Sequence, residues 1–367
     1  MEPVTESLAH VNRRQFLKTA AVGVASLAAG PALLEACGGA GSNSNSGSQH
    51  FIATPDVEKA KKEGTVVLYT SLDTLILEAI NKGFTDKYGI KVEYFRGGSV
   101  DATNKALSES TAGQNRVDVI DASDVASFIV MKQKGLLRPY DSPETKTVAS
   151  NLRDKDNYWV ADRLTQGVIE YNTKLVSDPP QHWKDLADPR FMSQLAYFSA
   201  SNGDGAPRIY TLVQSLGWGL IESYAKNKPL RVDTPQLITQ IVERGERAAS
   251  FVQNDNIAWR SKLSGKSTDY VYPSEGVPTE LGAVGVAAKA PHPNAALLYY
   301  NYWMSRDGQQ LLVDGGKYSS RSDMPPPKGS KPVKDIKLLV LNYDEYQKNK
   351  QEILNRMTKI FGGEWGA

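Results

Sequence analysis

Residues 66–99 read as a strand, a helix and a second strand, and this unit restricts the fold of the chain more than any other stretch. Residues 66–69 (VVLY) are a short apolar run, which is typical of a strand covered on both faces. Apolar side chains then recur at helical spacing over residues 72–84, and Gly89 is suited to the left-handed conformation that ends a helix. Residues 90–95 supply the second strand. The stretch therefore predicts a β-α-β unit with two parallel strands.

Small polar residues and glycines follow three successive predicted strands. In a parallel sheet the carboxyl ends of the strands lie at one edge, where open α/β sheets bind ligands. Backbone N–H groups and hydroxyls at the helix N-termini there can hold an anion, although plain helix capping also accounts for Ser, Thr and Asp in these positions. The candidate binding residues of this edge are Thr70, Ser71, Gly98, Ser99 and Ser123.

Composition excludes several classes of protein. The chain has 367 residues, of which 40% are hydrophobic and 23% charged, as in a globular protein of two domains. Its net charge of +2 is too small to indicate a nucleic-acid or membrane-surface partner. Cys37 is the only cysteine, so no intramolecular disulfide and no multi-cysteine metal site can form. The four histidines are scattered without metal-ligand spacing, and no cofactor is expected.

The first 55 residues are predicted to be an export signal and a tether. Arg13 and Arg14 belong to an R-R-x-F-L-K pattern before an apolar run interrupted by glycine and proline, which resembles a twin-arginine signal. Residues 34–37 (LEAC) look like a lipobox, so residues 1–36 are predicted to be removed and Cys37 to be lipidated. A Gly/Ser-rich tether follows over residues 37–55. The alternative is an incidental cysteine beside an ordinary signal-peptidase site.

The alternation of strands and helices continues and then restarts. Residues 64–134 have the order β-α-β-α-β-α, which is typical of a doubly wound lobe. A second set of elements begins after Pro179, with a strand at 195–198 and helices at about 207–217 and 235–249. The predicted fold class is therefore α/β, with two doubly wound lobes.

With an export signal, a tether, two α/β lobes and no catalytic constellation, the chain resembles the substrate-binding proteins of bacterial ABC importers. More narrowly, it resembles the branch of extracellular solute-binding proteins that includes ferric-iron, phosphonate, sugar-phosphate and thiamine binders. The matching segments, which cover nearly the whole mature chain in the family's order, are Tyr69-Thr70-Ser71, Gly89-Ile90-Lys91-Val92, Asp118-Val119, Gly135-Leu136-Leu137, Tyr171-Asn172, Tyr272-Pro273-Ser274-Glu275-Gly276, Ala290-Pro291-His292-Pro293-Asn294-Ala295-Ala296 and Ser305-Arg306-Asp307-Gly308-Gln309.

The resemblance implies a Venus-flytrap architecture, the periplasmic binding protein-like II fold, in which two lobes joined by crossover strands close over a solute. Lobe one is then expected to comprise residues 64–162 and 272–367, including the C-terminal helix. Lobe two is expected to comprise residues 163–271. The crossovers are placed near residues 162–166 and 269–273.

The second lobe and the crossovers are predicted to complete the site. Residues 199–206 form a polar, glycine-rich turn that lets the backbone approach a phosphate or carboxylate, with a flexible surface loop as the alternative. Arg163, at the first crossover, is predicted to fix an anionic ligand, ahead of Arg96, Arg208 and Arg260 near other cleft edges. For each arginine taken singly, a solvated surface position is the default. The candidates are Ser199, Asn202, Gly203, Gly205, Ala206, Arg163, Trp259, Tyr272 and Glu275.

Two of these assignments have structural alternatives, and one cluster raises a different ligand. Trp259 can stack on a ligand or pack in the core, and Glu275 can face the ligand or lie in a turn. The run Tyr299-Tyr300-Asn301-Tyr302-Trp303 suggests ferric iron, because phenolates are hard ligands. The resemblance speaks against iron, since this run falls in a packing helix and residues 254–260 (NDNIAWR) lack the tyrosine pair expected there.

These observations predict a solute-binding protein without catalytic residues, metal ligands or a cofactor. It is expected to capture a small anionic organic solute between its lobes and to deliver it to the permease and ATPase of an ABC importer. A lipid-anchored monomer outside the cytoplasmic membrane is expected. The alternatives are a ferric-iron or other metal-binding transport protein of the same fold and, with less support, a secreted hydrolase. The sequence contains no nucleophile elbow, P-loop or H-E-x-x-H motif.

Overall fold

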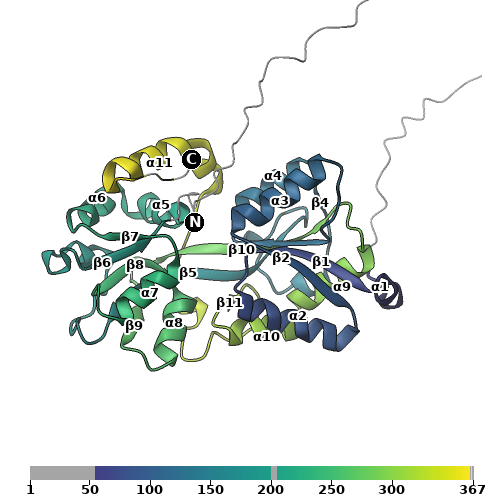
Figure 1. The fold of residues 1–367 in the computed structure, drawn as a ribbon, viewed down its shortest axis with the longest axis horizontal. Helices are drawn as coiled ribbons and strands as arrows, with labels where there is room; N and C mark the ends of the chain where they lie inside the picture. The colour runs from purple at the N-terminus through teal and green to yellow at the C-terminus, as the bar shows by residue number, and fades with distance from the viewer. Residues whose placement is uncertain (1–53, 200–204, 364, 366–367) are drawn as a thin grey trace, which may run out of the picture. The chain divides into compact units, whose positions relative to one another are not determined.

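The computed structural model describes residues 54–199, 205–363 and 365. These residues form two α/β lobes joined by two long neighbouring strands, β5 (Val160–Asn172) and β10 (Val277–Ala287), which run from one lobe into the other (Figure 1). The strand order across both lobes is β2-β1-β3-β10-β5-β8-β6-β7. The predicted two-lobed α/β fold is confirmed.

The first lobe is a parallel arrangement of β2, β1 and β3, closed by an antiparallel β10. Asp73 caps α2, and Gly89, where the sequence predicts the helix to end, has a φ of 71°. The elements of this lobe are α1 (Val57–Glu63), β1 (Thr65–Thr70), α2 (Thr74–Tyr88), β2 (Lys91–Arg96), α3 (Ser99–Thr111), β3 (Val119–Ala122), α4 (Val125–Gln133), β4 (Leu137–Arg138), α9 (Pro293–Met304), α10 (Arg306–Asp314) and β11 (Tyr318–Ser319).

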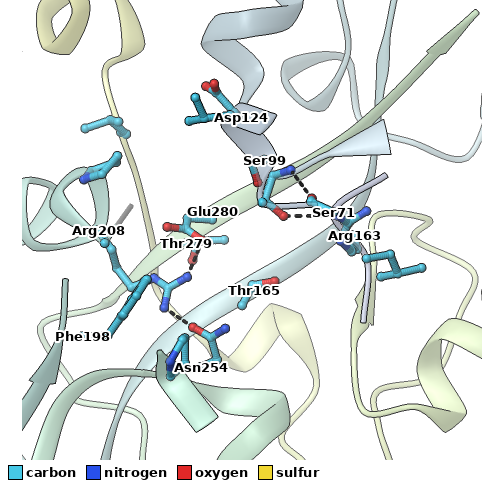
Figure 2. Close-up of a pocket in the computed structure, with 18 of the residues that line it drawn as sticks. Ser71, Ser99, Asp124, Arg163, Thr165, Phe198, Arg208, Asn254, Thr279 and Glu280 are labelled. Carbon is cyan, nitrogen blue, oxygen red and sulfur yellow. Dashed lines mark hydrogen bonds and ion pairs between the residues drawn. The ribbon is translucent and has the colours of Figure 1, made fainter. Parts of the chain in front are cut away.

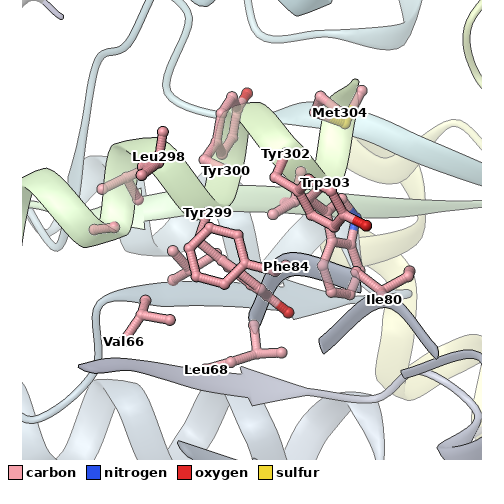
Figure 3. Close-up of a cluster of buried hydrophobic side chains, with 14 of the residues drawn as sticks. Val66, Leu68, Ile80, Phe84, Leu298, Tyr299, Tyr300, Tyr302, Trp303 and Met304 are labelled. Atoms are coloured by element: carbon pink, nitrogen blue, oxygen red, sulfur yellow. The ribbon is translucent and has the colours of Figure 1, made fainter. Parts of the chain in front are cut away.

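The tyrosine-rich run of α9 lies in the core of this lobe (Figure 3). Tyr299 and Trp303 are fully buried, and Tyr299 meets the ring of Phe84 edge-on with 4.9 Å between the ring centroids. The Tyr299 hydroxyl donates to Asn81, and the indole N–H of Trp303 donates to Asp162 over 2.8 Å. These side chains join α9 to α2 and to β5, so the run belongs to a packing helix, as the sequence predicts.

The second lobe places parallel strands β8, β6 and β7 beside the far end of β5. One prediction is wrong here: the helix expected over residues 235–249 ends at Glu243, and the chain re-enters the sheet as β8. Gly245, with a φ of 72°, makes the break between them. The elements are β6 (Leu195–Phe198), α5 (Ala206–Leu216), α6 (Trp218–Lys226), β7 (Leu230–Val232), α7 (Pro235–Glu243), β8 (Ala249–Asn254), α8 (Asp255–Leu263), β9 (Thr268–Val271), β12 (Leu338–Val340) and α11 (Tyr343–Phe361).

The C-terminal helix α11 packs on the second lobe, whereas the sequence-based division places it with the first. Its buried face joins the hydrophobic cluster of the second lobe through Met357 and its neighbours. Glu345 accepts hydrogen bonds from the Tyr210 hydroxyl (3.0 Å) and the Gln214 amide (3.1 Å) on α5, and Trp365 stacks on Tyr197. The apolar face of α11 is buried in this cluster. To place the helix there, the chain crosses from the first lobe to the second once more before α11 begins.

The return crossing also lies later than residues 269–273. Strand β9 still pairs with the second-lobe part of β5, and the turn at Gly276 accepts a hydrogen bond from the buried Trp183 of that lobe. The chain re-enters the first lobe only along β10, which pairs with β3 from Ala283 onward. Across the described residues, no helix combines the length and the apolar character needed to cross a membrane.

A buried carboxylate in the second lobe makes stability depend on pH. Glu170 of β5 accepts hydrogen bonds from Thr239 (3.0 and 2.9 Å) and Gln253 (3.3 Å), but burial raises its pKa from 4.5 to about 7. The folded state therefore holds this proton more tightly than the unfolded state does. The resulting stabilisation is complete below pH 4.5 and is lost as the pH rises through 7.

We expect Glu170→Gln to remove the loss of stability that the wild type shows as the pH rises through 7. The difference between the two pKa values corresponds to roughly 3 kcal/mol of unfolding free energy. Urea unfolding of the wild type and the variant at pH 4.5, 6 and 8 measures the difference. The exposed Glu246→Gln is the matched control and should follow the wild type. Parallel stability curves for wild type and Glu170→Gln across this range would contradict the assignment.

Candidate functional site

A cavity of about 620 Å³ lies where the two lobes and the crossing strands meet (Figure 2). Its lining comes from the loops after β1, β2 and β3, from α5, α7, α8 and α11, and from the middle of β5 and β10. Small-molecule sites in proteins typically measure ~300–1,000 Å³. The cavity is therefore the candidate ligand site, at the sheet edge that the sequence predicts.

Four of the five residues predicted for the first lobe line the cavity. Ser71, Gly98, Ser99 and Ser123 do so, and the Ser71 hydroxyl accepts a hydrogen bond from the Ser123 N–H over 3.2 Å. Thr70 is buried outside the lining, because its hydroxyl donates to Asp121 and accepts from the Leu72 N–H. Thr70 therefore shapes the loop, while its neighbours face the cavity.

The amino-terminus of α3 opens onto the cavity without a side-chain cap. Gly98 occupies the capping position, so it offers no side-chain oxygen to the first N–H groups of the helix. Asp101 instead accepts the N–H of Gly98 itself, over 3.1 Å. The free N–H groups and the positive end of the helix dipole are therefore directed to the cavity side.

The amino-terminus of α5 supplies a matching wall from the second lobe. Gly205, its capping residue, has a φ of 94°, and a Cβ there would lie 2.7 Å from the Phe198 carbonyl oxygen. Only glycine fits this turn. Ala206 and Ser199 are buried outside the lining, and Asn202 and Gly203 lie outside the described residues.

Arg208 projects from α5 and is held by three protein partners (Figure 2). Its guanidinium donates to the Val252 carbonyl over 3.1 Å and to the Asn254 side chain, and it forms an ion pair with Glu280 of β10. The side chain is only 4% exposed. These contacts join α5, β8 and β10 beside the cavity, so the charge of Arg208 is compensated within the protein.

Arg163 lines the cavity floor, but carboxylates of the protein engage its guanidinium. Nη1 contacts both Asp121 and Asp162, and Nη2 donates to the Ser123 hydroxyl over 3.1 Å. Burial raises the pKa of Asp121 to about 6 even though Arg163 acts to lower it. The sequence assigns Arg163 to the ligand, whereas in the fold its guanidinium contacts two buried acids, Asp162 on the same strand and Asp121 on β3.

An ion pair connects the lobes beside the cavity. Asp73, the capping residue of α2, lies 2.8 Å from Arg260 of α8. Burial acts to raise the pKa of Asp73, but the hydrogen bond and charge of Arg260 outweigh it and lower that pKa. Asp73 is thus compensated by a cation of the opposite lobe.

Three further predicted residues, Trp259, Tyr272 and Glu275, lie away from the cavity lining. Trp259 packs against Gly316, where a Cβ would lie 2.5 Å from its ring, and its indole N–H donates to the Lys328 carbonyl over 2.8 Å. Tyr272 lines a smaller cavity of about 410 Å³, and its hydroxyl pairs with that of Tyr318 over 3.1 Å. Glu275 lies 3.4 Å from His182. Tyr272 and Glu275 miss the site because the return crossing is made by β10, after them in the chain.

Sequence reasoning misses the group at the centre of the floor, namely Thr165, Asn256 and Lys317. Alternation along β5 from Arg163 is the signal that could have found Thr165, which lies on the same face. No local pattern points to Lys317, which follows α10 and is 152 positions from the threonine it contacts. Among the described residues, no three His, Cys, Asp or Glu side chains are placed to hold a metal ion.

Comparisons with known proteins agree with this architecture. A sequence profile of the family described as bacterial extracellular solute-binding protein matches residues 65–316. An uncharacterized protein of Haemophilus influenzae is 25% identical over 272 residues, which cover 70% of this chain and 78% of that one.

Two solved structures have a similar fold. The periplasmic binding protein AfuA from Actinobacillus pleuropneumoniae, with exogenous fructose-6-phosphate bound, superposes with a TM-score of 0.70 at 21% identity, over 81% of this chain and 98% of that one. Iron-bound HitA from Pseudomonas aeruginosa gives a TM-score of 0.68 at 19% identity, over 79% and 99% of the two chains.

The chain belongs to the bacterial extracellular solute-binding proteins. Proteins of this family act outside the cytoplasm and deliver solutes to the permeases of ABC importers. The class predicted from the sequence is confirmed.

The contacts of Arg163 predict a large effect on stability. Arg163→Met leaves Asp121 and Asp162 buried without their cation, and breaking a buried pair in this way costs about 3–5 kcal/mol. Arg244→Met, which removes an exposed pair with Glu246, should cost less than about 1 kcal/mol. Chemical unfolding of both variants measures the difference, and equal stabilities would refute the structural role of Arg163.

Proposed function

We propose that the protein captures a small organic anion, a carboxylate or phosphate ester, reversibly and without chemical conversion, and passes it to the permease and ATPase of an ABC importer. One observation carries the choice of an anion: two helix amino-termini without side-chain caps, at Gly98 of α3 and Gly205 of α5, line the same cavity from opposite lobes. The free N–H groups at the start of α3 and the dipole ends of both helices favour a negative ligand, although the second residue of α5, Pro207, has no N–H.

The charges of the lining support the same class of ligand. Of the four acids in the lining, Glu280 and Asp73 are each paired with an arginine. Asp124 accepts hydrogen bonds from Ser127, and among the described residues neither Asp124 nor the exposed Asp233 has a cation within 4.0 Å. Arg96, at the end of β2, has only its Nε hydrogen-bonded among the described residues, to the Leu72 carbonyl over 3.1 Å, and its charge is available to a ligand. AfuA binds a sugar phosphate on a similar fold, which agrees with this proposal.

Ferric iron remains the alternative, because HitA carries iron on the same fold. Here the tyrosines of α9 are core residues, with Tyr299 and Trp303 packed on α2, so this run offers no phenolate to the cavity. Tyr343 and Tyr346 of α11 do line the cavity, but among the described residues no three His, Cys, Asp or Glu side chains are placed to hold a metal ion. The anion is therefore the better supported ligand.

A negative charge introduced at the start of α3 should weaken anion binding without lowering the stability of the protein. We expect Ser99→Asp to weaken anion binding at least about tenfold, because like charges across a binding interface cost several kcal/mol. Its melting temperature should not fall, since an acid near a helix amino-terminus is favourable. Ser108→Asp, exposed on the same helix outside the lining, is the control.

The measurement is a thermal-shift screen followed by calorimetry on wild type and both variants. The panel holds fructose 6-phosphate, citrate, inorganic phosphate, spermidine and ferric citrate. The ligand is recovered after binding and should be chemically unchanged, as expected for binding without conversion. Binding of spermidine or ferric citrate alone would exclude the anion, as would an unaltered anion affinity in Ser99→Asp.

We further propose that residues 1–36 are a twin-arginine export signal and that a lipid on Cys37 anchors the protein through its tether. The R-R-x-F-L-K pattern and the LEAC segment support this proposal, and both lie outside the described residues. We expect the Cys37→Ala protein to be absent from the membrane fraction. The Ser44→Ala protein, the control in the tether, should stay in that fraction. The intact mass of the N-terminal peptide should show a lipidated Cys37; an unmodified terminus elsewhere would disprove the anchor.

A further inference from the structure

Three buried cations line the cavity, and one of them has no carboxylate beside it. Arg163 contacts Asp121 and Asp162, and Arg208 contacts Glu280. Among the described residues, no carboxylate oxygen comes within 4.0 Å of the ammonium of Lys317, which is 7% exposed. Buried charges in proteins are ordinarily paired, because an isolated ion loses its hydration without compensation. Lys317 therefore lacks an anion.

The hydrogen bonds of Lys317 leave donors free at the same point. Its ammonium donates to Thr165 Oγ1 over 3.0 Å and to Asn256 Oδ1 over 2.8 Å. An ammonium has three N–H donors, so one is left. In the described part of the chain, the Asn256 amide N–H₂ and the Thr165 hydroxyl proton have no acceptor either. All three residues line the cavity, and Thr165 and Asn256 are 3% and 2% exposed.

Asp255 acts on Lys317 through its charge but does not form an ion pair with it. Asp255 accepts the N–H groups of Asn256 (2.9 Å) and Gln166 (3.3 Å). Burial lowers the pKa of Lys317 to about 8, although the charge of Asp255 acts to raise it. The lowered pKa is consistent with an ammonium group whose charge Asp255 offsets only partly, without an ion pair.

The turn that carries Lys317 is fixed by packing. Gly316, with a φ of 90°, lies against the ring of Trp259, and the ring is held by its hydrogen bond to the Lys328 carbonyl. Lys317 comes from the segment after α10, Thr165 from the crossing strand β5, and Asn256 from α8 of the second lobe. The three donors are thus assembled by both lobes at the floor of the cavity, where Thr165 lies between the groups around Arg208 and Arg163 (Figure 2).

We propose that Lys317, Thr165 and Asn256 form the subsite for the anionic group of the ligand, a carboxylate or phosphate, and that Lys317 is its counter-ion. This inference rests on the proposed function and assigns the role first given to Arg163 to a different residue. The anion accepts the third ammonium proton together with the amide and hydroxyl protons, which completes the hydrogen bonding of all three side chains.

The test compares affinities by calorimetry for fructose 6-phosphate, citrate and inorganic phosphate. We expect Lys317→Met to bind whichever anion the wild type binds roughly tenfold or more weakly, because a charge-assisted hydrogen bond is lost. Thr165→Val, which removes only the hydroxyl, should weaken binding by a few fold. Lys334→Met, an exposed lysine outside the cavity lining, should match the wild type.

The outcomes separate this inference from the proposed function. Wild-type affinity in Lys317→Met, with binding still weakened in Ser99→Asp, would overturn the subsite and leave the anion proposal standing. If Lys317→Met does not fold, Thr165→Val decides, and an unchanged affinity in it overturns the subsite. A wild-type protein that binds spermidine or ferric citrate but none of the three anions overturns both.

Discussion

The buried contact of Arg163 with Asp121 and Asp162 is the interaction on which the arrangement of the two lobes depends. It joins the crossing strand β5 to β3 of the first lobe, and Asp162 also accepts the indole N–H of Trp303 on α9. Removing a guanidinium and two carboxylates from water is expensive unless they meet one another. A shift of β5 by one residue would turn these side chains to the opposite faces and leave them unpaired. The register of the crossing strand is thereby fixed.

The fixed strand places the site. Because Arg163 is held in the first lobe, Thr165 two positions further along the same face lies at the middle of the cavity floor, and the remainder of β5 continues into the second lobe. The ion pair between Asp73 and Arg260 that links the lobes beside the cavity is partly exposed, and such pairs contribute at most about 1 kcal/mol. The crossing strands hold the lobes together strongly, while this direct contact between them is weak, which suits a fold whose lobes close over a ligand.

The cations of the cavity divide into two groups by their partners. Arg163 is compensated by Asp121 and Asp162, and Arg208 by Glu280, so they stabilise the fold and add little net charge to the cavity. Lys317 has hydrogen bonds to neutral groups only. Together with the uncapped helix ends at Gly98 and Gly205, it adds donors to a lining in which Glu280 and Asp73 are paired with arginines. The proposed anion would recover there the hydrogen bonds that it loses on leaving water.

Local patterns in the sequence are enough to predict the β1-α2-β2 unit and the stop at Gly89, because each depends on residues a few positions apart. The packing role of the tyrosine run follows from the family resemblance. Local patterns also place Ser71, Gly98, Ser99 and Ser123 at the sheet edge that lines the cavity, since all three loops follow parallel strands. Tertiary structure alone decides that β8 is a strand, that β10 makes the return crossing and that α11 covers the second lobe. It also decides which cation lacks an ion pair: only the folded chain brings Asp121 to Arg163, whereas Lys317 meets Thr165 across 152 positions and, among the described residues, has no carboxylate oxygen within 4.0 Å.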